Sequence, residues 1–94
     1  MAKRTEKPKT QMGVVTWYDA HADSTGSWTT LQDIDPDPYL VTTVGVILPD
    51  FTKQGHVSVA QSIGQGSIDG IIHIPEKMVS EITILGTLDI DELL

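Results

Sequence analysis

Hydrophobic and polar side chains alternate along most of the chain with the two-residue period of a β-strand. The clearest example is segment 56–63, in which Val57, Val59 and Ile63 share one face. His56 and three small residues, two serines and an alanine, occupy the other face. This pattern predicts a strand with one buried face and one polar face.

Five segments have strand character, because each is rich in β-branched or aromatic residues and is bounded by turn-forming residues. They are 13–18, 39–48, 56–63, 70–75 and 80–85. The second is the longest and is apolar on both faces, which favours a central place in a sheet. Gly45 in its middle predicts a bulge or a sharp bend, as small barrels use to turn a corner.

The sequence predicts tight turns for the connections at 49–55 and 75–79. Segment 49–55 opens with Pro and Asp and closes with Gly, which is typical of a hairpin loop. Segment 75–79 is too short for a stable helix and long enough for one 3₁₀ turn.

The connection between the first two strands has a different pattern. Trp28, Leu31 and Ile34 lie three residues apart, Ser27 is a candidate N-cap, and the two prolines of segment 35–38 end any helix. We expect a brief helical turn whose Trp28 and Leu31 close one open end of a barrel. A long mobile loop is the alternative.

These elements predict an all-β fold, a small five-stranded antiparallel barrel of the SH3-like or Sm-like type, with one short helical turn between strands 1 and 2. An open antiparallel sheet with one short helix is the alternative. The expected organisation is a disordered basic tail at 1–12, the barrel at 13–85 and an acidic-apolar tail at 86–94. The leucines of that last tail need burial on the same domain or on a neighbouring copy, so we expect a homo-oligomer.

Charge is distributed unevenly along the chain. The 94 residues carry 13 acidic and 6 basic side chains, a net charge of -7. The first ten residues have a net charge of +3, and the remaining 84 hold only Lys53 and Lys77 against twelve acids, a net charge of -10. We expect the basic segment to be a solvated tail, and the alternative is a basic extension that reaches a phosphate backbone or an acidic partner.

Composition excludes several classes of protein. The chain has no cysteine, so it has no disulfide, no zinc–thiolate site and no cysteine nucleophile. No apolar run approaches the ~20 residues that a membrane span needs, and the first residues lack the apolar core of a signal peptide. These features predict a soluble, cytoplasmic protein without a membrane partner.

Three potential metal ligands, Asp19, His21 and Asp23, alternate just after the first strand and would share a face of an extended chain. The preferred interpretation is a solvated or turn-capping loop. Segment 33–37 has the alternating acids of a calcium loop but lacks the glycine and glutamate that an EF-hand needs, so a rigid acidic turn is preferred there.

The glycine-rich segment 64–70 follows a strand but leads into another strand, which excludes a dinucleotide-binding fingerprint. Its backbone amides could face an anion or a neighbouring subunit, and a plain hairpin connection is the alternative. No Gly-x-Ser-x-Gly elbow is present, and His73 alternates with isoleucines as a surface-facing strand residue. We therefore expect no enzyme, no catalytic residue and no cofactor.

Six short motifs resemble those of very small, functionally uncharacterised proteins of tailed bacteriophages. They are Val15-Thr-Trp17-Tyr-Asp19, Ser27-Trp28, Thr43-Val-Gly45-Val, Val57-Ser-Val-Ala-Gln61-Ser, Ile72-His-Ile-Pro75 and Val79-Ser-Glu-Ile82. The resemblance implies a phage-encoded accessory protein that acts in the host cytoplasm, in counter-defence or host takeover.

A second resemblance concerns the end of the domain. A strand that ends in Ile74-Pro75, one turn and the strand Ile82-Thr-Ile84-Leu85 are similar to the last two strands of Sm-like proteins. That family implies ring oligomers and often RNA binding. This chain lacks a recognisable uridine-pocket motif and has an acidic body, so we do not expect nucleic acid as its partner.

Three functions remain open. The favoured hypothesis is a non-catalytic binding module that sequesters or inhibits a host protein, because an acidic body steers towards a basic surface. The alternatives are an oligomeric sponge for a nucleotide second messenger and an RNA- or single-stranded-DNA-binding Sm-like protein. The candidate ligand-binding residues are Trp17, Tyr18, Trp28, Tyr39, Lys53, His56, Gly64 and Gly66.

Overall fold

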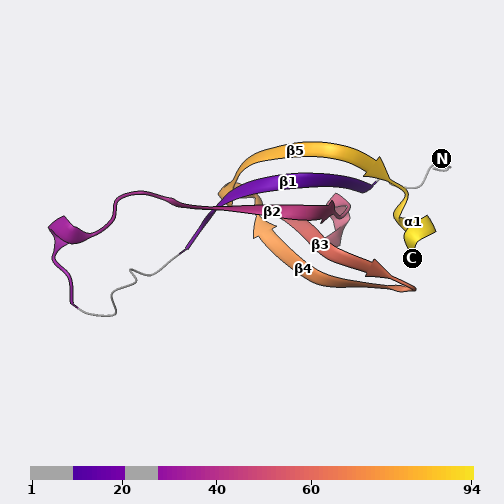
Figure 1. Ribbon diagram of the computed structural model, residues 1–94, viewed down its shortest axis with the longest axis horizontal. Helices are drawn as coiled ribbons and strands as arrows, with labels where there is room; N and C mark the ends of the chain where they lie inside the picture. Colours follow the sequence, from indigo (N-terminus) through magenta and orange to yellow (C-terminus); the bar gives the residue numbers. More distant parts are fainter. Residues whose placement is uncertain (1–9, 21–27) are drawn as a thin grey trace.

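The computed structural model describes residues 10–20 and 28–94, which form one five-stranded antiparallel sheet in the order β4-β3-β2-β1-β5 (Figure 1). The strands are β1 (Thr10–Asp19), β2 (Tyr39–Ile47), β3 (His56–Gly64), β4 (Ser67–Pro75) and β5 (Val79–Leu88). The helical elements are the 3₁₀ turns η1 (Leu31–Asp33), η2 (Asp50–Thr52) and η3 (Glu76–Met78), and the short helix α1 (Ile90–Leu93). The expected all-β fold with five antiparallel strands is confirmed. Within the described residues, no helix combines the length and the apolar character needed to cross a membrane.

The predicted strands coincide closely with the observed ones. β2 and β3 match to within one residue, whereas β4 begins at Ser67 instead of Gly70. β1 begins at Thr10 and β5 continues to Leu88, so residues 10–12 and 86–88, which were expected in the tails, belong to strands. The predicted 3₁₀ turn before the last strand is η3, and the predicted helical turn between the first two strands is η1. Alternation and turn residues therefore located every strand, including β5, whose residues from Ser80 to Thr87 are exposed.

The sheet is open in the described part of the chain, because β4 and β5 are its two outer strands and no pairing joins them. Closure into a barrel, as the sequence analysis expected, would require that pairing. Because β5 has no partner on its outer side in the described residues, the side chains of Ile82 and Ile84 are 41% and 44% exposed. The interior is thus accessible along the edge of β5.

A small core lies on one face of this curved sheet. Val15, Val59 and Ile74 are fully buried there, one each from β1, β3 and β4. Trp17 packs against them, and its indole Nε1–H donates a hydrogen bond of 3.0 Å to the hydroxyl of Thr43 on β2. That bond satisfies the one polar group of a half-buried indole.

Gly45 allows β2 and β3 to approach closely where the sheet turns. A Cβ atom at Gly45 would lie 2.5 Å from the carbonyl oxygen of Ala60. The predicted bulge is absent from the β1–β2 ladder, since Gly13 and Gly45 pair in a regular register. Register shifts occur instead between β1 and β5, beside Gly13 and beside Trp17. The glycine is therefore required for the approach of two strands.

The C-terminal residues fold back on the same chain. Asp89 caps α1 by accepting a 3.1 Å hydrogen bond from the Asp91 N–H. The Gly66 N–H in the β3–β4 turn donates to the carbonyl oxygen of Leu94 at 3.3 Å. Leu93 and Leu94 remain 47% and 41% exposed, so the tail is only partly covered.

Replacing Gly45 with alanine is expected to lower the free energy of unfolding by about 2 kcal/mol, because the added Cβ collides with backbone atoms that cannot rotate away. Urea denaturation followed by circular dichroism measures the change. Gly86→Ala is the matched control, since its Cβ would meet no atom within 4 Å. Equal stability of the two variants would contradict this account of the strand approach.

Candidate functional site

Residues 28–38, called the arm below, extend away from the end of the sheet before the chain enters β2 (Figure 1). The Thr30 hydroxyl donates to Asp33 Oδ2 at 2.9 Å, and the Asp33 N–H donates to the Thr30 carbonyl at 3.1 Å. Further along, the Asp37 N–H donates to Asp35 Oδ1 at 3.0 Å. Every residue of the arm is exposed, so its shape comes from its own turns.

The arm exposes apolar side chains that the sequence analysis expected to be buried. Trp28 is 103% exposed, Leu31 is 88% exposed and Ile34 is 44% exposed. The expectation that Trp28 and Leu31 close the end of a barrel is therefore wrong. Their spacing predicted η1, but spacing does not show whether a surface lies opposite the apolar side chains. Trp28 and Leu31 thus present two almost fully exposed apolar side chains to solvent.

The arm is also acidic. It carries Asp33, Asp35 and Asp37, and no Lys, Arg or His occurs from Trp28 to Thr52. The side-chain bond from Asp35 and the two neighbouring prolines produce the acidic turn that the sequence predicts. Apolar anchors and negative charge are thus combined within eleven residues, 28–38.

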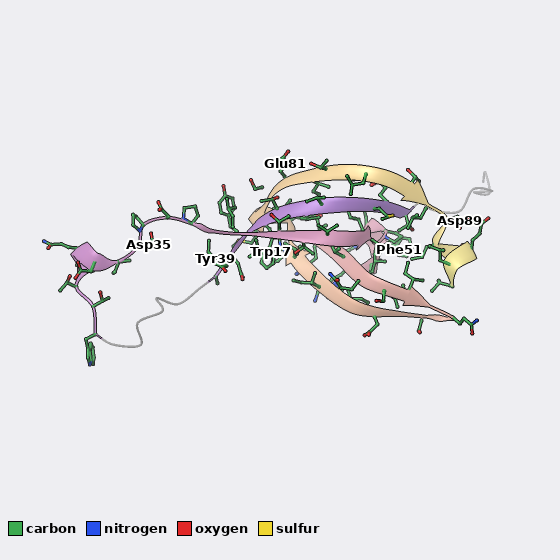
Figure 2. The ribbon with its side chains drawn as sticks, in the orientation of Figure 1. Trp17, Asp35, Tyr39, Phe51, Glu81 and Asp89 are labelled. Atoms are coloured by element: carbon green, nitrogen blue, oxygen red, sulfur yellow. The ribbon has the colours of Figure 1, made fainter. Side chains whose placement is uncertain are left out.

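The base of the arm is held by the last pairs of the β1–β2 ladder. Asp19 pairs with Tyr39 and Tyr18 with Leu40. Tyr18 is 40% exposed and Tyr39 is 54% exposed, and the register places them on opposite faces of the ladder. Figure 2 shows Tyr39 beside the end of the sheet, with Trp17 further in and Asp35 out on the arm.

The eight candidate ligand-binding residues do not form one site. Trp17 lies on the core face and Tyr18 on the opposite face, while Trp28 lies on the arm. Lys53 follows η2, and His56 begins β3 and pairs with Pro75 of β4. Phe51 of η2 lies apart from Tyr39 in Figure 2. Trp17 and Tyr39 are close in the β1–β2 register, and the other candidates come from the arm, the segment after η2, β3 and the turn that follows β3.

The glycine-rich turn and His56 already have local partners. Gly64 ends β3, and Gly66 in the following turn has a φ of 73° and donates its N–H to the Leu94 carbonyl. His56 Nδ1 lies 2.9 Å from the Gln54 carbonyl, which can only accept, so Nδ1 carries the proton. The Gly66 amide is engaged within the chain and does not face a free anion.

Of the candidate metal ligands, Asp19 is half-buried at the end of β1, and His21 and Asp23 lie outside the described residues. Across residues 10–20 and 28–94, no group of three or more His, Cys, Asp or Glu residues could hold a metal ion.

The structure also reveals a serine–histidine pair that the sequence analysis missed. The Ser58 hydroxyl, 3% exposed, lies 2.6 Å from Nδ1 of His73. The His56 ring meets His73 edge to face, with centroids 6.5 Å apart. Ser58 and His73 are partners in the β3–β4 register, and the alternation within a single strand does not reveal such a pair. The hydrogen bond satisfies a buried hydroxyl, and this role is structural.

Comparison of the chain with protein-family models, with curated proteins and with solved structures finds no match in any of the three.

Replacing Trp28 with phenylalanine is expected to remove the tryptophan emission that acrylamide quenches most strongly, because Trp28 is fully exposed and Trp17 is half-buried. The free energy of unfolding should change by less than about 0.5 kcal/mol, as for other surface substitutions. The control is Trp17→Phe, which removes the bond to Thr43 and should destabilise the fold. If Trp28→Phe left quenching unchanged, the arm would be packed in solution.

Proposed function

We propose that the protein is a non-catalytic binding module that sequesters a protein partner through the arm. The observation that carries this proposal is the exposure of Trp28 and Leu31 on a segment that also bears three aspartates. The partner would present an apolar groove bordered by lysine or arginine side chains.

The size of the apolar contribution supports the proposal. A tryptophan side chain buries about 200 Å², which corresponds to roughly 5 kcal/mol of transfer free energy before the costs of association. A leucine adds about 2 kcal/mol on the same scale. Few residues of an interface normally carry most of its binding energy, and tryptophan is prominent among them. The arm is thus large enough to anchor a complex.

The negative charge of the arm would raise the rate of association with a basic partner and the selectivity for it. Asp33, Asp35 and Asp37 supply three of the negative charges of residues 11–94, whose net charge is -10. Such a field accelerates association with a basic surface and disfavours acidic partners. It also makes the association rate sensitive to salt.

The resemblance to tailed-bacteriophage proteins suggests where such a module acts. A phage-encoded protein of this kind would bind a host protein in the cytoplasm, and its effect would be to inhibit that protein. This part of the proposal rests on the short sequence motifs. The nucleotide-sponge and RNA-binding alternatives rank lower, because the eight candidate residues are spread over several elements of the sheet and the arm.

The experiment uses the full chain with a photoreactive benzoylphenylalanine in place of Trp28, irradiated in a lysate of the natural host. We expect one or a few crosslinked proteins with basic surfaces, identified by mass spectrometry and then purified. Unmodified chain should bind the purified partner, and Trp28→Ala together with Leu31→Ser should weaken binding at least about 100-fold. Raising salt from about 0.05 to about 0.5 M should slow association.

The matched control is Phe51→Ala, which removes another exposed aromatic residue, 74% exposed, from η2. It should leave the affinity unchanged. Equal binding by the wild-type chain and the arm variant would overturn the proposal, as would a purified partner whose association rate is insensitive to salt.

A further inference from the structure

Two histidines from neighbouring strands, His56 of β3 and His73 of β4, lie side by side. Because His73 pairs with Ser58, two residues after His56, the two histidines are diagonal neighbours on one face of the ladder. Their chain neighbours Val57 and Ile74 belong to the core, so the histidines lie on the opposite face. His56 is half-buried and His73 is exposed, which means that solvent reaches the pair.

Each of the two rings is held through its Nδ1 atom. His56 Nδ1 donates to the Gln54 carbonyl at 2.9 Å. His73 Nδ1 lies 2.6 Å from the Ser58 hydroxyl, which bonds the ring in either tautomer because a hydroxyl both donates and accepts. Neither Nε2 has a hydrogen-bond partner among the described residues. Metal-binding histidines are oriented in this way, with one ring nitrogen on a neighbouring group and the other on the metal.

The separation of the two rings is close to the separation that a shared metal ion requires. Their centroids lie 6.5 Å apart, and the planes of the rings make an angle of 87°. Two imidazoles that bind one zinc ion through Nε2 at ~2.1 Å, in tetrahedral geometry, have centroids about 5 Å apart. The χ2 torsion of histidine has a broad minimum, so rotation of the two side chains brings the rings together without movement of the strands.

The donor atoms select the class of ion. Imidazole suits zinc, copper and nickel ions, whereas magnesium and calcium ions prefer oxygen ligands. Two imidazoles leave the other coordination positions to water, and this agrees with the finding that residues 10–20 and 28–94 hold no group of three ligands. Lys53 and Lys77 are close along the chain and oppose a cation, while Glu76 favours one. The bonds to nitrogen, and not the local charge, would therefore hold the ion.

We propose that His56 and His73 form a binding site for one divalent ion of the zinc class, bound through the two Nε2 atoms. The Gln54 carbonyl and the Ser58 hydroxyl orient the rings, and water completes the coordination. The site uses no residue of the arm, so it is independent of the contact with a protein partner proposed above.

Isothermal titration calorimetry of the full chain with ZnCl₂, in a non-coordinating buffer at neutral pH, tests the proposal. We expect one ion per chain with a dissociation constant between about 1 and about 100 µM. MgCl₂ should give no binding. His56→Asn and His73→Asn should each weaken zinc binding at least about tenfold. Asparagine places its amide near the position of Nδ1, so it retains the bond to Gln54 or Ser58 and removes only Nε2.

A second measurement serves if either variant fails to fold, which circular dichroism shows. A long-range ¹H–¹⁵N spectrum of the wild-type chain distinguishes the two ring nitrogens of each histidine. Zinc should shift the Nε2 resonances of His56 and His73 and leave the proton on both Nδ1 atoms. Unshifted Nε2 resonances in the presence of bound zinc would contradict the proposal.

The matched control is His21→Asn, which removes the third histidine of the chain and should leave zinc binding unchanged. A wild-type chain that binds no zinc at up to about 1 mM would overturn the proposal. Loss of binding in His21→Asn, with binding retained in His56→Asn and His73→Asn, would also overturn it. That result would assign the ion to the motif Asp19, His21 and Asp23 instead.

Discussion

The ladder between β1 and β2 is the interaction on which the other features of the molecule depend. Its nine consecutive pairs run from Gln11–Ile47 to Asp19–Tyr39 without a shift. One face of the ladder carries Val15 and Trp17 into the core, and its end holds the base of the arm. Because side chains alternate, a shift of one residue would exchange the core face of the ladder with its opposite face. The register thus determines both the stability of the sheet and the surfaces it offers.

The two halves of the sheet are joined in a different way. The β2–β3 ladder has the pairs Val46–Ala60 and Ile47–Val59, immediately after Gly45, and the Leu48 N–H continues it by donating to the Ser58 carbonyl at 2.8 Å. The three fully buried side chains, Val15, Val59 and Ile74, come from β1, β3 and β4. Packing in the core therefore adds to these backbone hydrogen bonds in holding β3 and β4 against the β5-β1-β2 half. The close approach at Gly45 is what allows that packing.

The sequence predicted the strands well and the surfaces poorly, and the reason is physical. Strand positions depend on local alternation and on turn residues, which the chain displays directly. Closure of the sheet depends on pairing between β4 and β5, and burial of Trp28 depends on a surface opposite it. The spacing of apolar residues along the sequence shows neither the pairing of β4 with β5 nor the burial of Trp28. The Ser58–His73 bond likewise requires the register of two strands, although both residues were visible in the sequence.

The arm has a further property that follows from its backbone. Pro36 and Pro38 fix two φ angles, and the Asp35–Asp37 hydrogen bond holds the turn that joins them. A segment restrained in this way loses less conformational entropy when a partner orders it than a flexible loop would lose. Its few apolar contacts can then yield an affinity that a flexible peptide of the same composition would not reach. The prolines that end the helical turn also leave the arm partly organised before it meets any partner.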